Sequence, residues 1–226
     1  MLVDRKQVVV AGYGGERWGA YEHALFSPDY GLDLKEINSL TGWDKPFEQR
    51  VTEAKRLIAE AGYPSGLKLK MPVETQPQMR NRAVLMADVW KKNLNVESDI
   101  SSQDKTVLLD MRDKGDFHVF WGNTMSFVGD PDEIMGYFVG GRPSNFIGYS
   151  SSVLDKLADQ QAREMDLAKR KQLVQQAERT ILTDMAVSPQ ALYAYMVGWW
   201  PWVKGFVVQK TGYGSNFVFE HVWIDK

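Results

Sequence analysis

Residues 67–73 read LKLKMPV, and the chain continues through PQMRNRAVLMADVW at 77–90, NVESDI at 95–100 and KTVLLDMR at 105–112 to FHVFW at 117–121. The first and third pieces alternate in the manner of β-strands, and the second and fourth carry apolar residues at helical spacing. FHVFW is a short, nearly continuous apolar run, which predicts a buried strand. This order of strand, helix, strand, helix, strand predicts an α/β layer with at least partly parallel pairing.

The flanking sequence adds further elements. Upstream, 3–11 read as the end of a helix stopped by Gly12, 12–45 as a long irregular segment rich in Gly, Pro and aromatic residues, and 46–61 as a helix opened by Pro46. Downstream, the patterns predict a short helix at 131–138, two amphipathic helices at 150–161 and 166–183 with Asp166 as N-cap of the second, and strands at 192–197, 206–209 and 217–224.

Composition excludes several classes of function. The formal net charge is -2 and the pI about 6.0, so there is no bulk basic field of the kind that holds nucleic acid. Cysteine is absent, and the three histidines form no HxxxH pair, which argues against thiolate chemistry and against a histidine zinc site. No apolar run approaches the ~20 residues of a membrane helix. We expect no metal and no cofactor.

The run Asp130-Pro131-Asp132-Glu133 places three carboxylates within four residues. A metal site or an acid/base pair is one interpretation. The other is a helix start in which Asp130 is the N-cap, Pro131 occupies the first turn and the two following acids face the helix dipole. We favour the helix start. A glycosidase using Asp130 and Asp132 is the enzymatic alternative, and it requires two separated carboxylates that face one cleft.

The best candidate for a binding surface follows the third predicted strand, because ligands of open α/β sheets sit outside the carboxyl ends of strands. There the chain offers apolar rings and neutral hydrogen-bonding groups, and three tryptophans at 199, 200 and 202 form a second aromatic group. The candidate ligand-binding residues are Trp121, Asn123, Thr124, Ser126 and Phe127, together with Trp199 and Trp200.

The order of motifs resembles the family 5 extracellular solute-binding proteins, the receptors of ABC importers for peptides, nickel, opines and some sugars. The resemblance runs almost the whole chain and rests on these matches: Asp4-Arg5 with the Val-rich run after it, Ala61-Gly62-Tyr63-Pro64 with Gly66, the helix with Ala87 and Trp90, Gly115–Val119, the Gly129–Asp132 turn, Asn145–Tyr149 with Leu154 and Asp155, the helix from Asp166 to Leu182, and Val203-Lys204-Gly205.

This resemblance implies an α/β lobe like those of type II periplasmic-binding proteins, with a mixed sheet flanked by helices. Residues 1–205 would form the C-terminal lobe of a two-lobed receptor, and 206–226 would be strands that return to the N-terminal lobe. The protein would not be an enzyme. It would be periplasmic, capture a small solute between its lobes and dock on an ABC permease. Because the chain opens inside a helical motif, we expect an excised lobe without its signal peptide.

The chain departs from the family at one place that bears on the ligand. Dipeptide and oligopeptide binders usually carry an Asp after a Gly-Trp pair, which anchors the α-ammonium of the peptide; here that position falls on Phe127, and the Gly-Trp pair falls on Asn123-Thr124. A buried ammonium without a counter-charge is strongly disfavoured. A longer peptide, a modified amine, a sugar or an opine-like compound therefore stays open, as does a protein-interaction module that uses its aromatic surface.

Overall fold

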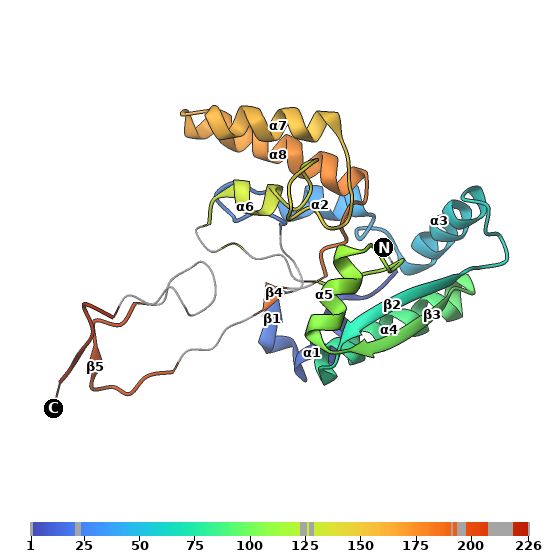
Figure 1. Cartoon of the computed structure of the whole chain (residues 1–226), viewed down its shortest axis with the longest axis horizontal. Helices are drawn as coiled ribbons and strands as arrows, with labels where there is room; N and C mark the ends of the chain where they lie inside the picture. The colour runs from blue at the N-terminus through green and yellow to red at the C-terminus, as the bar shows by residue number, and fades with distance from the viewer. Residues whose placement is uncertain are drawn as a thin grey trace.

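The computed structural model describes residues 2–20, 24–122, 126, 129–190, 192–193, 198–207 and 219–225. These residues form three parts, namely an α/β layer, a helical group and a C-terminal ribbon (Figure 1). In Figure 1 the helical group lies above the α/β layer, and the ribbon projects away from both. Among the described helices, none is long and apolar enough to cross a membrane.

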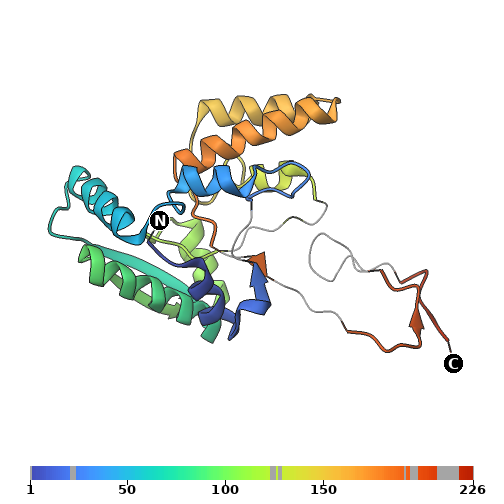
Figure 2. The same cartoon turned by 180° about the vertical axis from the view of Figure 1, so that it is seen from behind.

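The α/β layer is built on two parallel strands, β2 (Lys68–Glu74) and β3 (Glu97–Gln103), which pair in register from one end to the other. Helix α4 (Pro77–Leu94) connects them, and α5 (Lys105–Asp113) follows β3. Figures 1 and 2 show α4 and α5 on opposite faces of the strand pair. The strand–helix–strand–helix order expected from 67–112 is thus confirmed.

The buried third strand expected at 117–121 is wrong. Phe117–Trp121 is not a strand, and none of its side chains is buried. The segment does lie beside β2, because the amides of His118 and Val119 both donate to the carbonyl of Lys70, at 2.9 and 3.1 Å. The amide of Lys70 in turn donates to the ring nitrogen Nδ1 of His118, at 2.8 Å. A side chain therefore occupies the position that a backbone carbonyl would need, and no regular ladder forms.

Two of the helices that precede β2 in the sequence contact α4. Helix α1 (Arg5–Tyr13) packs on α4, and it ends at Gly14, in the left-handed conformation with φ 76°, two residues beyond the expected stop at Gly12. Helix α3 (Phe47–Glu60) begins after Pro46, as expected. A short 3-10 turn (Glu16–Trp18) and strand β1 (Gly19–Ala20) follow α1, and β1 pairs antiparallel with β4 (Leu192–Tyr193).

The helical group comprises α2 (Leu34–Thr41), α6 (Pro131–Met135), α7 (Ser152–Arg163) and α8 (Leu167–Thr183). Its larger apolar cluster has Phe26, Met135, Phe138 and Leu154 among its buried members, and Ile37 of α2 packs with Leu32 and Leu182 in a smaller one. The helices expected near 131, 150 and 166 are confirmed, and both proposed N-caps, Asp130 and Asp166, accept hydrogen bonds from the first turn of their helices.

Helix α2 lies inside the segment that the sequence predicts to be irregular. Asp33 caps it by accepting a hydrogen bond from the amide of Glu36, at 2.9 Å, and Gly42 ends it in the left-handed conformation with φ 72°. Arg179 of α8 forms an ion pair with Glu36 and ties α2 to the group. The caps were readable in the sequence as D-x-x-E followed by Gly, but the surrounding Gly, Pro and aromatic residues obscured them.

A fully buried carboxylate holds the irregular segment before α2. Glu178 of α8 accepts hydrogen bonds from the amides of Leu25 and Leu32, at 2.5 and 2.7 Å. Burial raises the pKa of Glu178 above its ordinary value, against the opposing effect of the backbone amides that donate to it. Glu178 thus supplies the hydrogen-bond acceptors that residues 24–32 need where they leave water.

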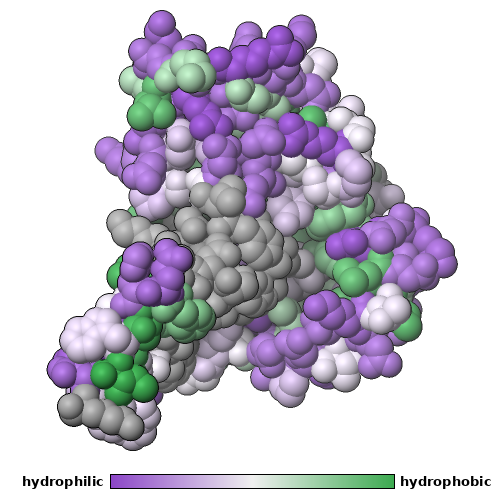
Figure 3. All heavy atoms as spheres, turned by 60° about the vertical axis from the view of Figure 1, so that its left-hand side comes forward, coloured by the Kyte–Doolittle hydropathy of each residue, from purple (hydrophilic) through white to green (hydrophobic). Residues whose placement is uncertain are grey.

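The C-terminal ribbon joins β5 (Val203–Lys204) to β6 (Trp223–Ile224) in an antiparallel pair. Large apolar side chains of the ribbon face water, Phe219 and Ile224 among them. Figure 3 shows hydrophobic surface on this projecting part of the molecule. Of the strand expected at 192–197, only 192–193 is described, and those residues are strand. Phe206 and Val207 are not in a strand, and of 217–224 only 223–224 is a described strand, while 208–218 lie outside the described residues.

Candidate functional site

The carboxyl ends of β2 and β3 form the edge at which an α/β sheet presents a ligand. From the last residue of β2 onward, three side chains are joined in a line: Gln76 Nε2 donates to Glu74 at 2.7 Å, and Gln78 Nε2 donates to Gln76 at 2.6 Å. On the neighbouring strand Ser102 accepts from Arg80 at 3.1 Å. These residues are not among those predicted from the sequence, although their place at the end of the strand LKLKMPV is a usable signal.

Trp121 lies between two parts of the core instead of standing free in a cleft. Its half-buried ring packs against the cluster that contains Val8 and Met86 and against the cluster that contains Met71 and Val73. The guanidinium of Arg82 lies 5.7 Å from the Trp121 ring. The ring thus anchors the start of the loop that leads to α6, and any ligand contact would use only its exposed part.

Ser126 is tied to the start of α6. Its hydroxyl donates to Oε2 of Glu133, at 2.6 Å, and accepts from the amide of Gly129, at 2.9 Å. Gly129 has φ 74°, a conformation that favours glycine. The remaining loop candidates, Asn123, Thr124 and Phe127, lie outside the described residues.

Trp199 and Trp200 belong to the C-terminal ribbon and not to the loop after Trp121. Trp200 is 65% exposed and stacks on Trp202 with ring centroids 4.8 Å apart and an interplanar angle of 6°. Trp199, 48% exposed, contacts Phe206 at 4.9 Å. Within the described residues, the ring contacts of Trp199 and Trp200 are thus with the ribbon itself, whereas those of Trp121 are with the core.

The acidic run at 130–133 is a helix start, as predicted from the sequence. Besides capping α6, Asp130 pairs with Arg170 at 2.8 Å, and Asp132 pairs with Arg142 at 2.8 Å. Gln161 connects the two pairs, since it accepts from Arg170 at 3.1 Å and donates to Asp132 at 3.2 Å. Both carboxylates are thus used within the fold, which argues against the glycosidase that would employ Asp130 and Asp132. Among the described residues no three His, Asp or Glu side chains gather as a metal site requires.

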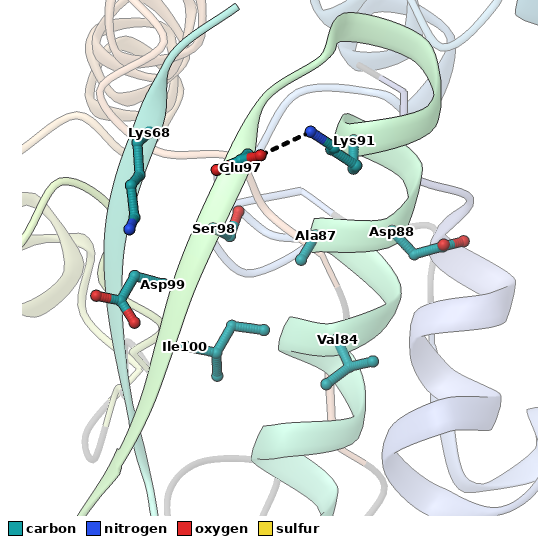
Figure 4. Close-up of a pocket in the computed structure, with 9 residues that line it drawn as sticks. All are labelled: Lys68, Val84, Ala87, Asp88, Lys91, Glu97, Ser98, Asp99 and Ile100. Carbon is teal, nitrogen blue, oxygen red and sulfur yellow. Dashed lines mark hydrogen bonds and ion pairs between the residues drawn. The ribbon is translucent and has the colours of Figure 1, made fainter.

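A shallow, open hollow of about 530 Å³ lies between α4 and the outer side of β3 (Figure 4). Val84 and Ile100 form its apolar floor, and its rim is charged. Lys91 at this rim is already paired with Glu97, at 2.8 Å, as the dashed line in Figure 4 shows. The hollow lies along the flank of β3 and not at the carboxyl end of the strands, so we do not assign the ligand to it.

Comparison with known proteins gives the following matches. The model of the family "Bacterial extracellular solute-binding proteins, family 5 Middle" matches residues 1–146. The periplasmic oligopeptide-binding protein OppA of Salmonella typhimurium is 29% identical over 167 residues, which cover 73% of this chain and 31% of the relative. The periplasmic murein peptide-binding protein MppA of Escherichia coli is 27% identical over 217 residues, covering 92% of this chain and 38% of the relative.

Solved structures agree on the fold. The periplasmic binding protein DppA of Helicobacter pylori, in complex with peptide STSA, superposes with a TM-score of 0.75 at 21% identity, covering 100% of this chain and 42% of that one. The α/β fold expected from the sequence, of the periplasmic-binding-protein type II class, is confirmed. The chain spans about a third of the length of the curated relatives it matches, 31% for OppA and 38% for MppA.

Proposed function

The chain belongs to the bacterial extracellular solute-binding proteins of family 5, and from this premise we propose that it is one lobe of the substrate-binding component of an ABC importer. In this proposal the lobe closes with a second lobe on a peptide and so captures it for uptake. The single observation that carries the proposal is the family match over residues 1–146. Its extension to peptides rests on relatives named for oligopeptides and murein peptides.

The ligand face of this lobe would be the edge formed by the residues after β2 and the loop after Trp121. Gln76, Gln78 and Asn123 offer amide groups, which can both donate to and accept from a peptide backbone. Phe127, where peptide binders usually carry an Asp, suggests that the ammonium group of the peptide is bound elsewhere or is modified. Sugars and opines are the competing ligand classes.

The proposal also assigns a compartment and partners. Relatives bear the description periplasmic, and we place this protein in the periplasm, docking on an ABC permease. The exposed aromatic residues of the ribbon support a contact of 206–226 with the N-terminal lobe, because large apolar side chains that face water mark an interaction surface. We propose a binding function without catalysis, which agrees with the structural use of Asp130 and Asp132.

The test is to identify the ligand that co-purifies with the full-length product containing this chain. Denaturing mass spectrometry of the gently purified protein is expected to release peptides. Release of a sugar or an opine would overturn the peptide class but keep the transport function. Turnover of the released compound by the protein would overturn the proposal of a binding protein.

Replacing Asn123 by alanine in the full-length protein is expected to weaken peptide binding by about threefold to tenfold, the loss of one hydrogen bond. The measurement is isothermal titration calorimetry with the co-purified peptide. Asn93→Ala is the matched control, since Asn93 lies on α4 and donates to the carbonyl of Val89 at 2.8 Å. Equal affinities for the two variants would remove Asn123 from the site.

A further inference from the structure

The hydroxyl of Ser126 has its proton committed. A serine hydroxyl has one proton to donate and two lone pairs that accept. The proton goes to the carboxylate of Glu133, because a carboxylate can only accept, and the distance is 2.6 Å. One lone pair receives the amide of Gly129, at 2.9 Å. Ser126 can therefore interact with a further group only as an acceptor, through its second lone pair.

Glu133 is held firmly enough to impose this orientation. It lies in α6, whose neighbouring side chains Ile134 and Met135 are buried in the core of the helical group. Hydrophobic contacts alone would let so short a helix slide, since they have no direction. The ion pairs of Asp130 with Arg170 and of Asp132 with Arg142 supply directional bonds at the start of the same helix.

The surroundings of Ser126 allow contact with a ligand. The residue is half-buried, and it lies on the loop between Trp121, fixed in the core, and α6. A hydroxyl that donates to a carboxylate is polarised, and its oxygen becomes a better acceptor. A group with an N–H is the complementary partner, and a group that only accepts would meet two oxygen lone pairs without a proton between them.

We propose that Ser126 is a specificity-determining residue that accepts a hydrogen bond from an N–H of the ligand, and that Glu133 is its positioning residue. This inference rests on the proposed function and deepens it. A backbone amide of a peptide has the required N–H, whereas a carboxylate or a carbonyl oxygen, which can only accept, is selected against. Glu133 acts on the ligand only through Ser126.

The test uses tri-, tetra- and pentaalanine and their singly N-methylated forms, titrated into the full-length protein by calorimetry. We expect methylation at one position to weaken binding to the wild type by about tenfold through loss of the N–H bond. Ser126→Ala should bind the unmethylated peptide about tenfold more weakly and should no longer distinguish that methylated form. Loss of discrimination confined to one methyl position is a result that a general loss of stability would not give.

Glu133→Gln tests the positioning role, because a glutamine amide can donate to Ser126 and so release its proton. Its discrimination against the methylated peptide should fall, while Glu48→Gln, on the exposed side of α3, should keep the wild-type discrimination. Equal discrimination in the wild type and Ser126→Ala would overturn the inference but leave peptide binding intact. If none of these peptides binds the wild type, the proposed function itself fails for this ligand class, and the inference fails with it.

The hydrogen bond between Gly129 and Ser126 can also be tested without a ligand. The exchange rate of the Gly129 amide, measured by NMR, should rise in Ser126→Ala because its acceptor is gone. An unchanged rate would contradict the geometry on which the inference stands, whatever the binding data show.

Discussion

Replacing Glu178 by alanine is expected to lower the free energy of unfolding by about 4 kcal/mol, because several buried backbone amides would lose their acceptor at once and each unsatisfied donor costs about 1–3 kcal/mol. The amides of Leu25 and Leu32 are the ones affected most directly. Urea unfolding followed by circular dichroism measures the change. Gln176→Ala, at an exposed position of the same helix, is the matched control and should change stability by no more than about 0.5 kcal/mol.

The pH dependence of stability gives a second readout for Glu178. Because burial raises the pKa of this carboxyl, the folded state binds a proton more tightly than the unfolded state does. The contribution of Glu178 to stability is therefore largest below the unfolded pKa near 4.5 and is lost as the pH rises through the folded pKa. Glu178→Gln should remove this decline. If the free energies of unfolding of the wild type and of Glu178→Gln changed equally over this pH window, the raised pKa would be contradicted.

The second large effect is expected at Gly66, in the turn before β2. Gly66 has φ 93°, and a β-carbon there would overlap the backbone oxygen and carbon of Asn95. Asn95 is itself fixed as the C-cap of α4, and its side chain donates to the carbonyl of Ser65 at 2.7 Å. Gly66→Ala should therefore lower the free energy of unfolding by about 3 kcal/mol, the sum of the conformational strain and of the clash.

The matched control is Gly62→Ala. Gly62 has a nearly equal φ of 91°, but a β-carbon at Gly62 would meet nothing within 4 Å. This variant should show the conformational strain alone, about 1 kcal/mol. Thermal or urea unfolding of both variants separates the two contributions, and equal losses would show that the contact with Asn95 has no energetic weight.

Much of the fold could be predicted because its signals are local. The helices after Pro46 and Pro77 and the two helices that begin near 152 and 167 each carry an apolar stripe and a recognisable start. The segment at 117–121 shows the limit of such signals. Its apolar run says that it lies against the core, but only the tertiary structure reveals that the His118 ring takes the place of a ladder partner.

The candidate site was harder to predict for the same reason. The prediction of Trp121 and Ser126 rests on their position after an expected strand, yet their contacts come from α4, α6 and the core, which a local pattern does not encode. Glu178 gave no signal at all, since a glutamate within an amphipathic helix usually faces water. Its role depends on amides about 150 positions away along the chain, at separations of 153 and 146 residues.

That separation has a consequence for the order of events during synthesis. The unit β2–α4–β3 is contiguous, so it can close as soon as residues 68–103 have left the ribosome. The helical group cannot, because residues 24–32 must wait for Glu178 to emerge before their amides find an acceptor. A nascent chain arrested before α8 should therefore expose residues 24–32 to proteases and chaperones while its α/β layer is already folded.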